Sequence, residues 1–549
     1  MVELVRSQSI NLVLDKLRGV VGVENVVTSA EGLAARSRDT SLWHRTPSVV
    51  VYPATAQEVA EVVRIGAEFR LAVWPFSKGR NWGYGASMAF EDGAVIVVLE
   101  RMNRIVEVNQ ELAYAVIEPG VTQGQLNTYL KANRMKFWAD STDSTPEGSV
   151  IGNALERGVG YTPYSDHFGN LCGLEVVLPN GDLVRTGGGP EGSHTWHTYK
   201  WGTGPYIDGL FSQSNLGIVV KAGVWLMPEP EAFNCFICEL RDERDLPGAI
   251  DTIRRLRLDG ILRANVHIVN DVLFMAQMMQ YPYDLTTGEG RMRNEVRAEL
   301  RRRFKIAPWS ITGGIYGTAE QVTLVRAVVK KALSPYGRIT ILNDRRVSLV
   351  NGLTETWKLL RPVPGVSGAL SRLTGSSLEK FEVLRHVYPI LKGEPGEFIV
   401  SFAYFKSRYR PRRDVDPARD AAGLSWMAVL TPMTGRHVSE LLALCEPIFR
   451  RHELDMSTTF IMVNPRTALA LMQIFYNREI PEECQRALAL HHELMDITVK
   501  AGYQQYRASV ADSRSILNAN PQFQNLADTI KRAVDPDRVI APARYGIGL

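Results

Sequence analysis

The sequence predicts an α+β fold with a sheet-rich first half and a second region dominated by longer helices. From Ser48 to about Met227, short runs of β-branched residues alternate with turn signals. After the segment Pro228 to Glu231, helical patterns and charged irregular segments take over. The chain has 549 residues, of which 45% are hydrophobic. It is therefore long enough to bury large cores and to form two or more domains.

The first half opens with a strand, helix, strand pattern. Val49 to Tyr52 is predicted as a strand, Thr55 to Phe69 as an amphipathic helix capped by Thr55, and Val73 to Phe76 as a second strand. Pro179 to Asp182 marks a turn between two later strands. The other predicted strands of this half are 94–99, 105–108, 114–118, 174–178 and 218–226.

The second region begins with a predicted strand at 235–240. Helical patterns follow at 246–256 and 320–333, and a helix at 523–533 precedes a turn-rich stretch. The sequence contains no internal repeat and no low-complexity tract. These patterns indicate an ordinary two-part globular enzyme or binding protein.

Composition argues against several function classes. The net charge is +4 with both signs interspersed, and the one basic cluster, 408–413, adjoins Asp414 and Asp416, so a solvated loop is favoured over a nucleic-acid site. The five cysteines are scattered, and the lone pair Cys235 and Cys238 lacks a second ligand pair for zinc. No apolar signal-peptide core and no 18-residue apolar run occur, which predicts a cytoplasmic protein without a membrane span.

A glycine-rich loop directly after the strand 73–76 is the first candidate binding element. Gly79, Gly83 and Gly85 alternate with Lys78, Arg80 and Asn81. Backbone N–H groups of such a loop can approach a pyrophosphate closely, and the side chains can neutralise it. The loop matches neither G-x-G-x-x-G nor the Walker phosphate loop, so a tight surface turn stays open as the alternative.

Four further motifs follow in order along the first half. They are 118–122 (Glu-Pro-Gly-Val-Thr), 148–153 (Gly-Ser-Val-Ile-Gly-Asn), 161–167 (Tyr-Thr-Pro-Tyr-Ser-Asp-His) and 209–219 (Gly-Leu-Phe-Ser-Gln-Ser-Asn-Leu-Gly-Ile-Val). Together with the glycine loop, they resemble the vanillyl-alcohol oxidase and p-cresol methylhydroxylase family of FAD enzymes. The resemblance is close from Thr46 to Met227 and returns at Tyr506-Arg507 and at Val539 to Arg544.

The resemblance implies a PCMH-type FAD-binding domain of two α/β subdomains, with an inserted α+β cap domain over the flavin. The expected FAD-binding domain is split between residues 1–228 and 500–549, and the cap covers 229–499. Ala543 replaces a glycine of the family's terminal motif. The FAD-binding residues implied are Ser77, Lys78, Gly79, Arg80, Asn81, Trp82, Gly83, Pro119, Gly120, Gly148, Ser149, Val150, Gly152, Asn153, Gly217, Val219 and Arg544.

The family's phenol-binding residues correspond to Tyr84, Tyr506 and Arg507, and Tyr161 is a fourth catalytic candidate. Two phenolic hydroxyls and a guanidinium converging on one oxygen would lower the pKa of a substrate phenol and hold it as phenolate. Without the resemblance, a buried Tyr-Arg pair more often makes an ordinary core hydrogen bond. The implied reaction takes a hydride from the benzylic carbon para to the hydroxyl and leaves a p-quinone methide, resolved by hydration or rearrangement.

Several positions depart from the family pattern. Leu424 stands where the oxidases carry a flavin-linking histidine, which argues against a histidine link and leaves non-covalent FAD or a tyrosyl link through Tyr404 or Tyr409. Ser144 and Thr459 replace carboxylates found near the flavin in one branch or the other. Leu469-Ala470 replaces a His-His pair of the cap. The substrate cavity is therefore expected to be more apolar than usual, with no general base identifiable from the sequence.

Histidines also occur at two other places of possible functional interest. His491 and His492 lie on a predicted helix, where adjacent residues point about 100° apart and chelate a metal poorly, so a solvated helix face is expected. His167 is expected to be a structural or flavin-side residue.

Three functions stay open from the sequence. The first is oxidation of a para-substituted phenol such as a 4-alkylphenol or 4-hydroxybenzylic alcohol, with molecular oxygen or a cytochrome c as electron acceptor. The second keeps the flavin but acts on a larger lignan-like phenol or a non-phenolic alcohol. The third is a flavin-binding module without catalysis. Members of the family are commonly dimers or larger, which is the oligomeric state expected here.

Overall fold

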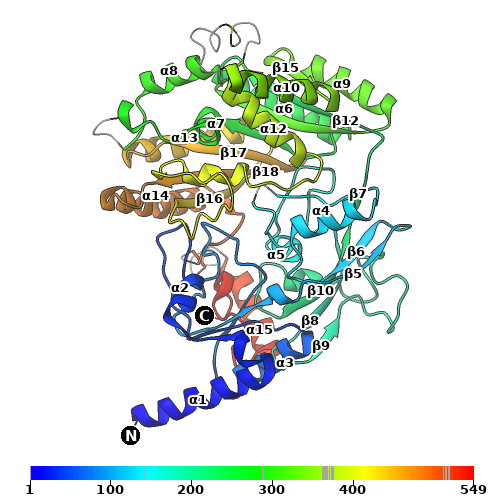
Figure 1. Cartoon of the computed structure of the whole chain (residues 1–549), viewed down its shortest axis with the longest axis vertical. Helices are drawn as coiled ribbons and strands as arrows, with labels where there is room; N and C mark the ends of the chain where they lie inside the picture. The colour runs from blue at the N-terminus through cyan, green and yellow to red at the C-terminus, as the bar shows by residue number, and fades with distance from the viewer. Residues whose placement is uncertain are drawn as a thin grey trace.

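The computed structural model describes residues 2–142, 144–286, 290–360, 369, 371, 376–510, 512–513, 516 and 520–548. It divides into a lower part that holds both termini and an upper part built on one large sheet (Figure 1). The lower part comes from the first half of the chain together with its last residues, as the colours of Figure 1 show. The described residues contain no helix long and apolar enough to cross a membrane.

The first sheet of the lower part has four strands in the order β1-β2-β4-β3, with β2, β4 and β3 parallel. Val73 of β3 donates its N–H to the Val539 carbonyl, and its own carbonyl accepts from the Ala541 N–H, so the C-terminal segment completes this edge. The elements are α1 (Val2–Val21), β1 (Val26–Val27), α2 (Ala30–Arg36), β2 (Val49–Val51), α3 (Ala56–Phe69), β3 (Val73–Phe76), β4 (Val95–Val98) and α15 (Pro521–Val534).

The second sheet is antiparallel throughout, in the order β5-β6-β10-β8-β9. Its inner face packs on α4 and α5 in one apolar core. The elements are β5 (Ile105–Asn109), β6 (Tyr114–Ile117), α4 (Gln123–Ala132), α5 (Val150–Leu155), β8 (Leu171–Val177), β9 (Leu183–Arg185) and β10 (Ile218–Trp225), with the separate pair β7 (Phe137–Trp138) and β11 (Met227–Pro228).

The upper part is an eight-stranded sheet in the order β15-β12-β14-β13-β17-β18-β16-β19, antiparallel at every pairing. Its strands are β12 (Ala232–Leu240), β13 (Val266–Asn270), β14 (Trp309–Gly317), β15 (Gly337–Leu342), β16 (Gly423–Pro432), β17 (Ser457–Asn464), β18 (Thr467–Tyr476) and β19 (Gln504–Gln505).

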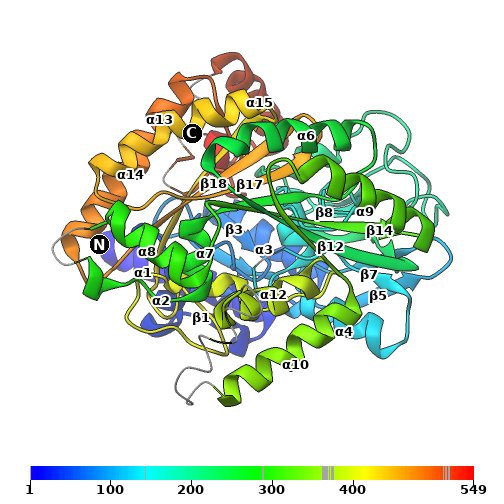
Figure 2. The ribbon, with the colours of Figure 1, turned by 90° about the horizontal axis from the view of Figure 1, so that it is seen from above.

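Side chains alternate between the two faces of this sheet, as the pleat requires. Phe236 and Cys238 of β12 pack into the core shared with four helices on one face. Cys235 belongs to the core on the other face. Viewed from above, α6, α13 and α14 lie toward one side of the upper part, and α10 and α12 toward the other (Figure 2). The helices are α6 (Leu246–Leu258), α7 (Asp271–Met278), α8 (Asn294–Phe304), α9 (Ala319–Leu333), α10 (Asp344–Leu360), α12 (Leu378–Ile390), α13 (Gly435–Arg451) and α14 (Pro481–Lys500).

Most predicted elements are confirmed within a few residues. The helix expected at 55–69 is α3, and the Thr55 side chain accepts a hydrogen bond from the Glu58 N–H as a cap. The turn at 179–182 joins β8 to β9. The domain boundaries at 228 and 500 stay a proposal, since β19 at 504–505 still pairs with β16 of the upper sheet.

Candidate active site

One buried carboxylate holds the glycine loop after β3 in place through hydrogen bonds. Asp39 accepts hydrogen bonds from the N–H groups of Gly83, at 2.8 Å, and Gly85, at 3.1 Å. The side chain of Ser41 also donates to it, at 2.5 Å. Burial raises the pKa of Asp39 although these donors oppose the rise. Two of the loop's N–H groups therefore fix the shape of the loop and are not directed at a ligand.

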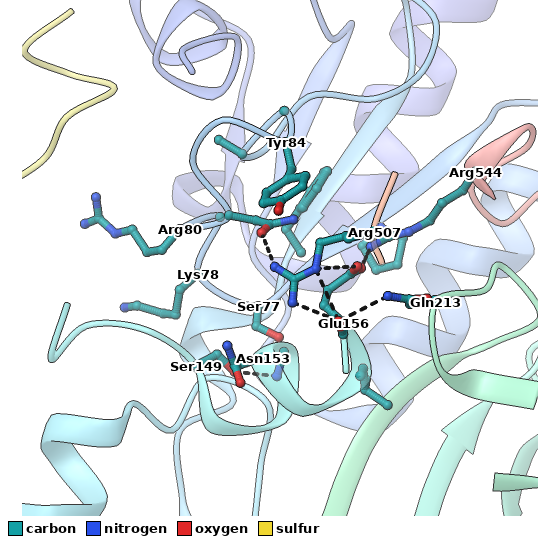
Figure 3. Close-up of a pocket in the computed structure, with 18 of the residues that line it drawn as sticks. Ser77, Lys78, Arg80, Tyr84, Ser149, Asn153, Glu156, Gln213, Arg507 and Arg544 are labelled. Atoms are coloured by element: carbon teal, nitrogen blue, oxygen red, sulfur yellow. Dashed lines mark hydrogen bonds and ion pairs between the residues drawn. The ribbon is translucent and has the colours of Figure 1, made fainter. Parts of the chain in front are cut away.

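The positive side chains of the loop are engaged by carboxylates. The Lys78 ammonium lies 3.8 Å from Glu100, and the Arg80 guanidinium pairs with Asp416. Both side chains point away from Arg507 in Figure 3. Their expected role in neutralising a pyrophosphate stays a prediction.

The N-terminus of α5 forms the opposite wall of the site. The Ser149 hydroxyl accepts from the Gly152 N–H at 2.9 Å and donates to the Pro119 carbonyl at 2.6 Å, which ties the helix to the 118–122 motif. At Gly120, an added Cβ would lie 2.7 Å from three backbone carbonyl oxygens, so only glycine fits there. One ring nitrogen of His167 lies 2.5 Å from Asn153 Oδ1 and the other 2.8 Å from Asp140, in agreement with a structural role.

Arg507 is the centre of the site (Figure 3). Its guanidinium carbon lies 5.2 Å from the ring centroids of both Tyr84 and Tyr506, a cation–π geometry on each side. The guanidinium donates to Asn81 Oδ1 at 2.9 Å and to the Glu156 carbonyl at 2.8 Å. Segment 506–510 is fixed at both ends, because the Tyr506 N–H donates to the Ala428 carbonyl and the Val510 N–H to the Tyr84 carbonyl.

The three predicted phenol-binding residues thus lie together, but their polar groups do not converge on one point. The Tyr506 hydroxyl donates to the Arg157 carbonyl. Burial raises the pKa of Tyr84, and the Arg507 charge only partly opposes this. The pKa of Tyr506 is raised in the same way. Both phenols are therefore neutral hydrogen-bond donors at pH 7.

Glu156 compensates the positive charge of this cluster. Its carboxylate accepts from Arg544 and, at 2.6 Å, from the Tyr545 hydroxyl, and lies 3.9 Å from Arg507. Burial alone would raise the pKa of Glu156, but Arg544 and Arg507 outweigh it and lower the pKa. Burial would also lower the pKa of Arg507, yet the neighbouring tyrosines and Glu156 raise it. Two guanidiniums against one carboxylate leave a net charge of +1.

The cleft around this cluster fits FAD. Gly152 and Gly217 line it, and a Cβ at Gly152 would lie 2.9 Å from Ser77 Oγ, so these positions keep a smooth wall against which a flat ring can lie. Arg507 and Arg544 supply positive charge for an anionic cofactor. The predicted residues that line the cleft are Ser77, Lys78, Gly79, Arg80, Asn81, Tyr84, Gly148, Ser149, Gly152, Asn153, Gly217, Val219, Arg507 and Arg544.

Other predicted site residues lie outside this lining. Trp82, Gly83, Pro119, Gly120, Val150 and Tyr506 do not line the cleft, and Tyr161 lines a second cavity, described below. The Tyr404 hydroxyl donates to Asp420 at 2.6 Å, and its side chain lines a separate pocket with Asp39 and Arg478. A tyrosyl link to flavin stays a prediction.

A second cavity, of about 220 Å³, lies in the upper part against the large sheet. Trp426 lines it, and the Trp426 ring stacks on that of Tyr84 with centroids 6.3 Å apart. The Trp426 indole N–H donates to the Trp82 carbonyl at 2.9 Å. Since Tyr84 lines the first cleft, the Tyr84–Trp426 pair separates the two cavities. The second cavity, called the cap cavity below, is the candidate substrate cavity.

His267 and Tyr161 form one wall of the cap cavity. Their rings stack with centroids 4.0 Å apart and an interplanar angle of 9°. Burial lowers the pKa of His267 to about 4, against the raising effect of the Gly160 carbonyl, so the imidazole is neutral at pH 7. Sequence reasoning missed His267, Trp426 and Gln473. The only signal available was one polar or bulky residue inside each of three largely apolar strand patterns, which forms no motif.

The prediction of a solvated helix face is wrong for His491, whereas His492 is exposed as predicted. His491 does not lie on a solvated face: it is 1% exposed, and its Nε2 lies 3.1 Å from Asp512. The side of α14 that carries His491 packs on the lower part, a tertiary contact that helical periodicity alone does not reveal. The described residues contain no cluster suited to a metal ion.

Comparison with known proteins agrees with this geometry. Residues 47–187 match the profile of an FAD binding domain. The chain is 36% identical to 1'-carboxy-chondrochloren decarboxylase of Chondromyces crocatus, over 98% of both chains. It is 31% identical to the flavoprotein subunit of 4-cresol dehydrogenase (hydroxylating) of Pseudomonas putida, over 98% of this chain and 96% of that one.

Solved structures give the same result. The structure of p-cresol methylhydroxylase with substrate bound superposes with a TM-score of 0.86 at 30% identity, covering 98% of this chain and 97% of that one. The 4-ethylphenol oxidase from Gulosibacter chungangensis superposes equally well at 26% identity, with the same coverage. The fold and the cleft define an FAD-dependent oxidoreductase with a PCMH-type FAD-binding domain. Within that class, the chain belongs to the vanillyl-alcohol oxidase and p-cresol methylhydroxylase family.

Proposed function

We propose that this enzyme removes a hydride from the benzylic carbon of a para-substituted phenol. The observation that supports the proposal is the position of Arg507, which lies against the rings of Tyr84 and Tyr506 and lines the FAD cleft. Tyr84 in turn stacks on Trp426, which lines the cap cavity. FAD, when bound, supplies the two-electron acceptor for the hydride.

The charged and polar residues around Arg507 would prepare the phenol for loss of the hydride. The net positive charge of the Arg507, Arg544 and Glu156 cluster favours a phenolate over a neutral phenol. The neutral hydroxyl of Tyr84 can donate to the phenol oxygen, and that of Tyr506 can donate to the same oxygen once it leaves the Arg157 carbonyl. Electron release from the phenolate weakens the para benzylic C–H bond, and loss of the hydride leaves a p-quinone methide.

Trp426, Tyr161 and His267 would hold the aromatic ring of the substrate. All three line the cap cavity, and Trp426 stacks on Tyr84. Stacking orients a ring without adding charge, and the dry surroundings strengthen the electrostatic effect of Arg507. The chain's own residues therefore bind and orient the phenol, exclude water and stabilise its negative charge.

The test is an absorbance measurement on the FAD-loaded protein. A panel of 4-alkylphenols and 4-hydroxybenzylic alcohols is added anaerobically, and bleaching of the flavin band is followed. The proposal predicts bleaching by para-substituted phenols and none by the matching O-methyl ethers, which cannot form a phenolate. Bleaching by non-phenolic alcohols instead, or by no compound at all, would contradict it and favour altered chemistry or a non-catalytic binding role.

A second outcome for the oxidised substrate is loss of carbon dioxide. The relative that shares 36% identity bears the name of a decarboxylase. Glu239 is the one carboxylate among the described residues that line the cap cavity, and it is ion-paired with Lys380 and Arg338. Hydration of a quinone methide benefits from a base that activates water, whereas decarboxylation needs none.

Decarboxylation balances without a further oxidant. If the carbon next to the benzylic carbon carries a carboxylate, the C–C bond pair forms the new alkene, the quinone methide becomes phenolate again, and CO₂ leaves. A 3-(4-hydroxyphenyl)propanoate probe distinguishes the two fates. Formation of 4-vinylphenol and CO₂ would support decarboxylation, and a benzylic alcohol that carries oxygen from labelled water would support hydration.

The electron acceptor, the assembly and the compartment stay proposals. We propose molecular oxygen or a cytochrome c as acceptor, a homodimer or larger assembly, a cytoplasmic location, and the split domain arrangement 1–228 plus 500–549 around a cap of 229–499. Recolouring of the reduced flavin on admission of air would identify oxygen as the acceptor.

A further inference from the structure

The cap cavity continues from the aromatic end across the face of the large sheet. Six of its lining residues stand directly opposite one another on six successive strands, as the pairing registers show. In order from the aromatic end, this row is Leu471, Thr459, Val269, Ser310, Glu239 and Arg338. Five steps between neighbouring strands correspond to about 24 Å along the sheet. A simple 4-alkylphenol fills only a small part of that length.

The middle of the cavity is mostly apolar. Leu273 and Phe274 of α7 and Phe381 and Leu384 of α12 line the side opposite the sheet. The row contributes Val269 together with the hydroxyls of Thr459 and Ser310. Such a wall accommodates an extended chain of low polarity.

The far end of the cavity is charged. Glu239 accepts from Arg338 at 2.6 Å and from Lys380. The side chains of Lys380 and Glu239 are 12% and 13% exposed, whereas that of Arg338 is 58% exposed, so this end faces solvent through Arg338. Two cations against one carboxylate leave a net charge of +1 on these three residues.

We propose that this charged end is a subsite for a carboxylate at the end of an extended para substituent, an inference that rests on the proposed oxidation of phenols. Lys380 and Arg338 would bind the carboxylate in competition with Glu239, and the apolar middle would hold the chain. The ring would lie against Trp426 and Tyr161. The subsite selects long anionic phenols over short neutral ones.

The experiment compares a graded series of phenols that carry an unbranched para chain ending in a carboxylate with the same chains ending in a primary amide. Turnover with an added artificial electron acceptor gives KM and kcat for each compound, and 4-ethylphenol serves as the short neutral reference. The expected KM falls as the acid chain lengthens, and the acid of best length has a KM on the order of 10-fold below its amide.

Three variants test the charged residues. Lys380→Gln is expected to raise KM for the long acid on the order of 10-fold to 100-fold, and Arg338→Gln roughly 10-fold, with KM for 4-ethylphenol unchanged. Glu239→Gln removes the competing carboxylate and is expected to lower KM for the long acid severalfold. Arg338→Gln and Glu239→Gln keep the test valid if Lys380→Gln does not fold.

The alternative role of the cluster is to tie α12 to the sheet, since Lys380 also donates to the Lys305 carbonyl at 2.9 Å. In that case Glu239→Gln would weaken binding of every substrate, and acids and amides would have equal KM values. Either result would overturn the subsite while 4-ethylphenol still reduces the flavin. If no phenol reduces the flavin, the proposed function itself fails. Calorimetric titration with analogues of the long acid and its amide whose chain is attached to the ring through an ether oxygen, and which therefore have no benzylic hydrogen, measures the same preference without turnover.

Discussion

The Glu156 carboxylate offers the sharpest test of the electrostatics at the candidate active site. Its side chain is 14% exposed and lies between Arg544 and Arg507, which are 22% and 10% exposed. Glu156→Gln keeps the size and one acceptor oxygen, so the Tyr545 hydroxyl can still donate. The substitution removes the negative charge that compensates the two largely buried guanidiniums of Arg544 and Arg507. A hydrogen bond to a charged group contributes about 1.5–3 kcal/mol, and breaking a buried ion pair costs somewhat more, so the expected loss is about 2–4 kcal/mol.

The sign of the pH dependence follows from the lowered pKa of Glu156. A carboxyl whose pKa is lower in the folded than in the unfolded state adds stability above its ordinary value of 4.5, and this stability disappears as the pH falls through the folded-state pKa. The difference between wild type and Glu156→Gln is therefore largest at pH 7 and shrinks below about pH 4.

The assay is the thermal midpoint of the FAD-loaded protein, because a chain with several domains need not unfold in one step. A loss of this size lowers the midpoint by about 5 °C or more at pH 7. Glu100→Gln is the matched control: Glu100 is 34% exposed and lies 3.6 Å or more from Arg36 and Lys78, so its loss costs less than about 1 kcal/mol. Equal midpoints for Glu156→Gln and wild type at pH 7 would refute the reasoning.

Two further predictions address the wall and the cavity. Gly120→Ala places a Cβ 2.7 Å from three carbonyl oxygens and is expected to abolish folding or FAD retention. Gly209→Ala is the control: its added Cβ has no atom within 4 Å, so the variant is expected to retain flavin absorbance. Equal flavin content in the two variants would contradict the packing argument. His267, with its pKa lowered to about 4 by burial, resists protonation in the folded state, so acidification from pH 6.5 to 4 costs the wild type up to roughly 3 kcal/mol that His267→Asn does not lose. Thermal midpoints across that range check this, and parallel curves for the two proteins would show that His267 is not desolvated.

Local signals in the sequence were sufficient for most of the fold. Thr55 caps α3 at the predicted residue, because a threonine before an amphipathic run satisfies the first free N–H groups of a helix. The turn at 179–182 and the strands of the first half follow from equally short-range chemistry. The pairing order of the eight-stranded sheet does not, since neighbours such as β13 and β17 are separated by about two hundred residues.

The same distinction between short-range and long-range signals holds for the candidate site. Tyr84 and Arg507 were predictable because they stand in contiguous motifs. His267, Trp426 and Gln473 stand alone on three different strands, and only the register of those strands brings them to one cavity. The anchoring of the glycine loop by Asp39 was also out of reach, because a single aspartate some 40 residues upstream carries no motif of its own.

The central claim is that Arg507 stabilises a substrate phenolate, and the pH dependence of flavin reduction in Arg507→Ala tests it most directly. The FAD-loaded variant is mixed anaerobically with a 4-alkylphenol between pH 7 and 10, beside wild type and Arg255→Ala, which removes an exposed ion pair with Asp259 on α6. The account predicts a loss of roughly 10-fold to 100-fold at pH 7, as expected when a buried charged hydrogen bond is removed. It further predicts that the rate recovers as the pH approaches the phenol's own pKa of about 10. A wild-type rate at pH 7, or a loss that high pH does not restore, would contradict phenolate stabilisation by Arg507.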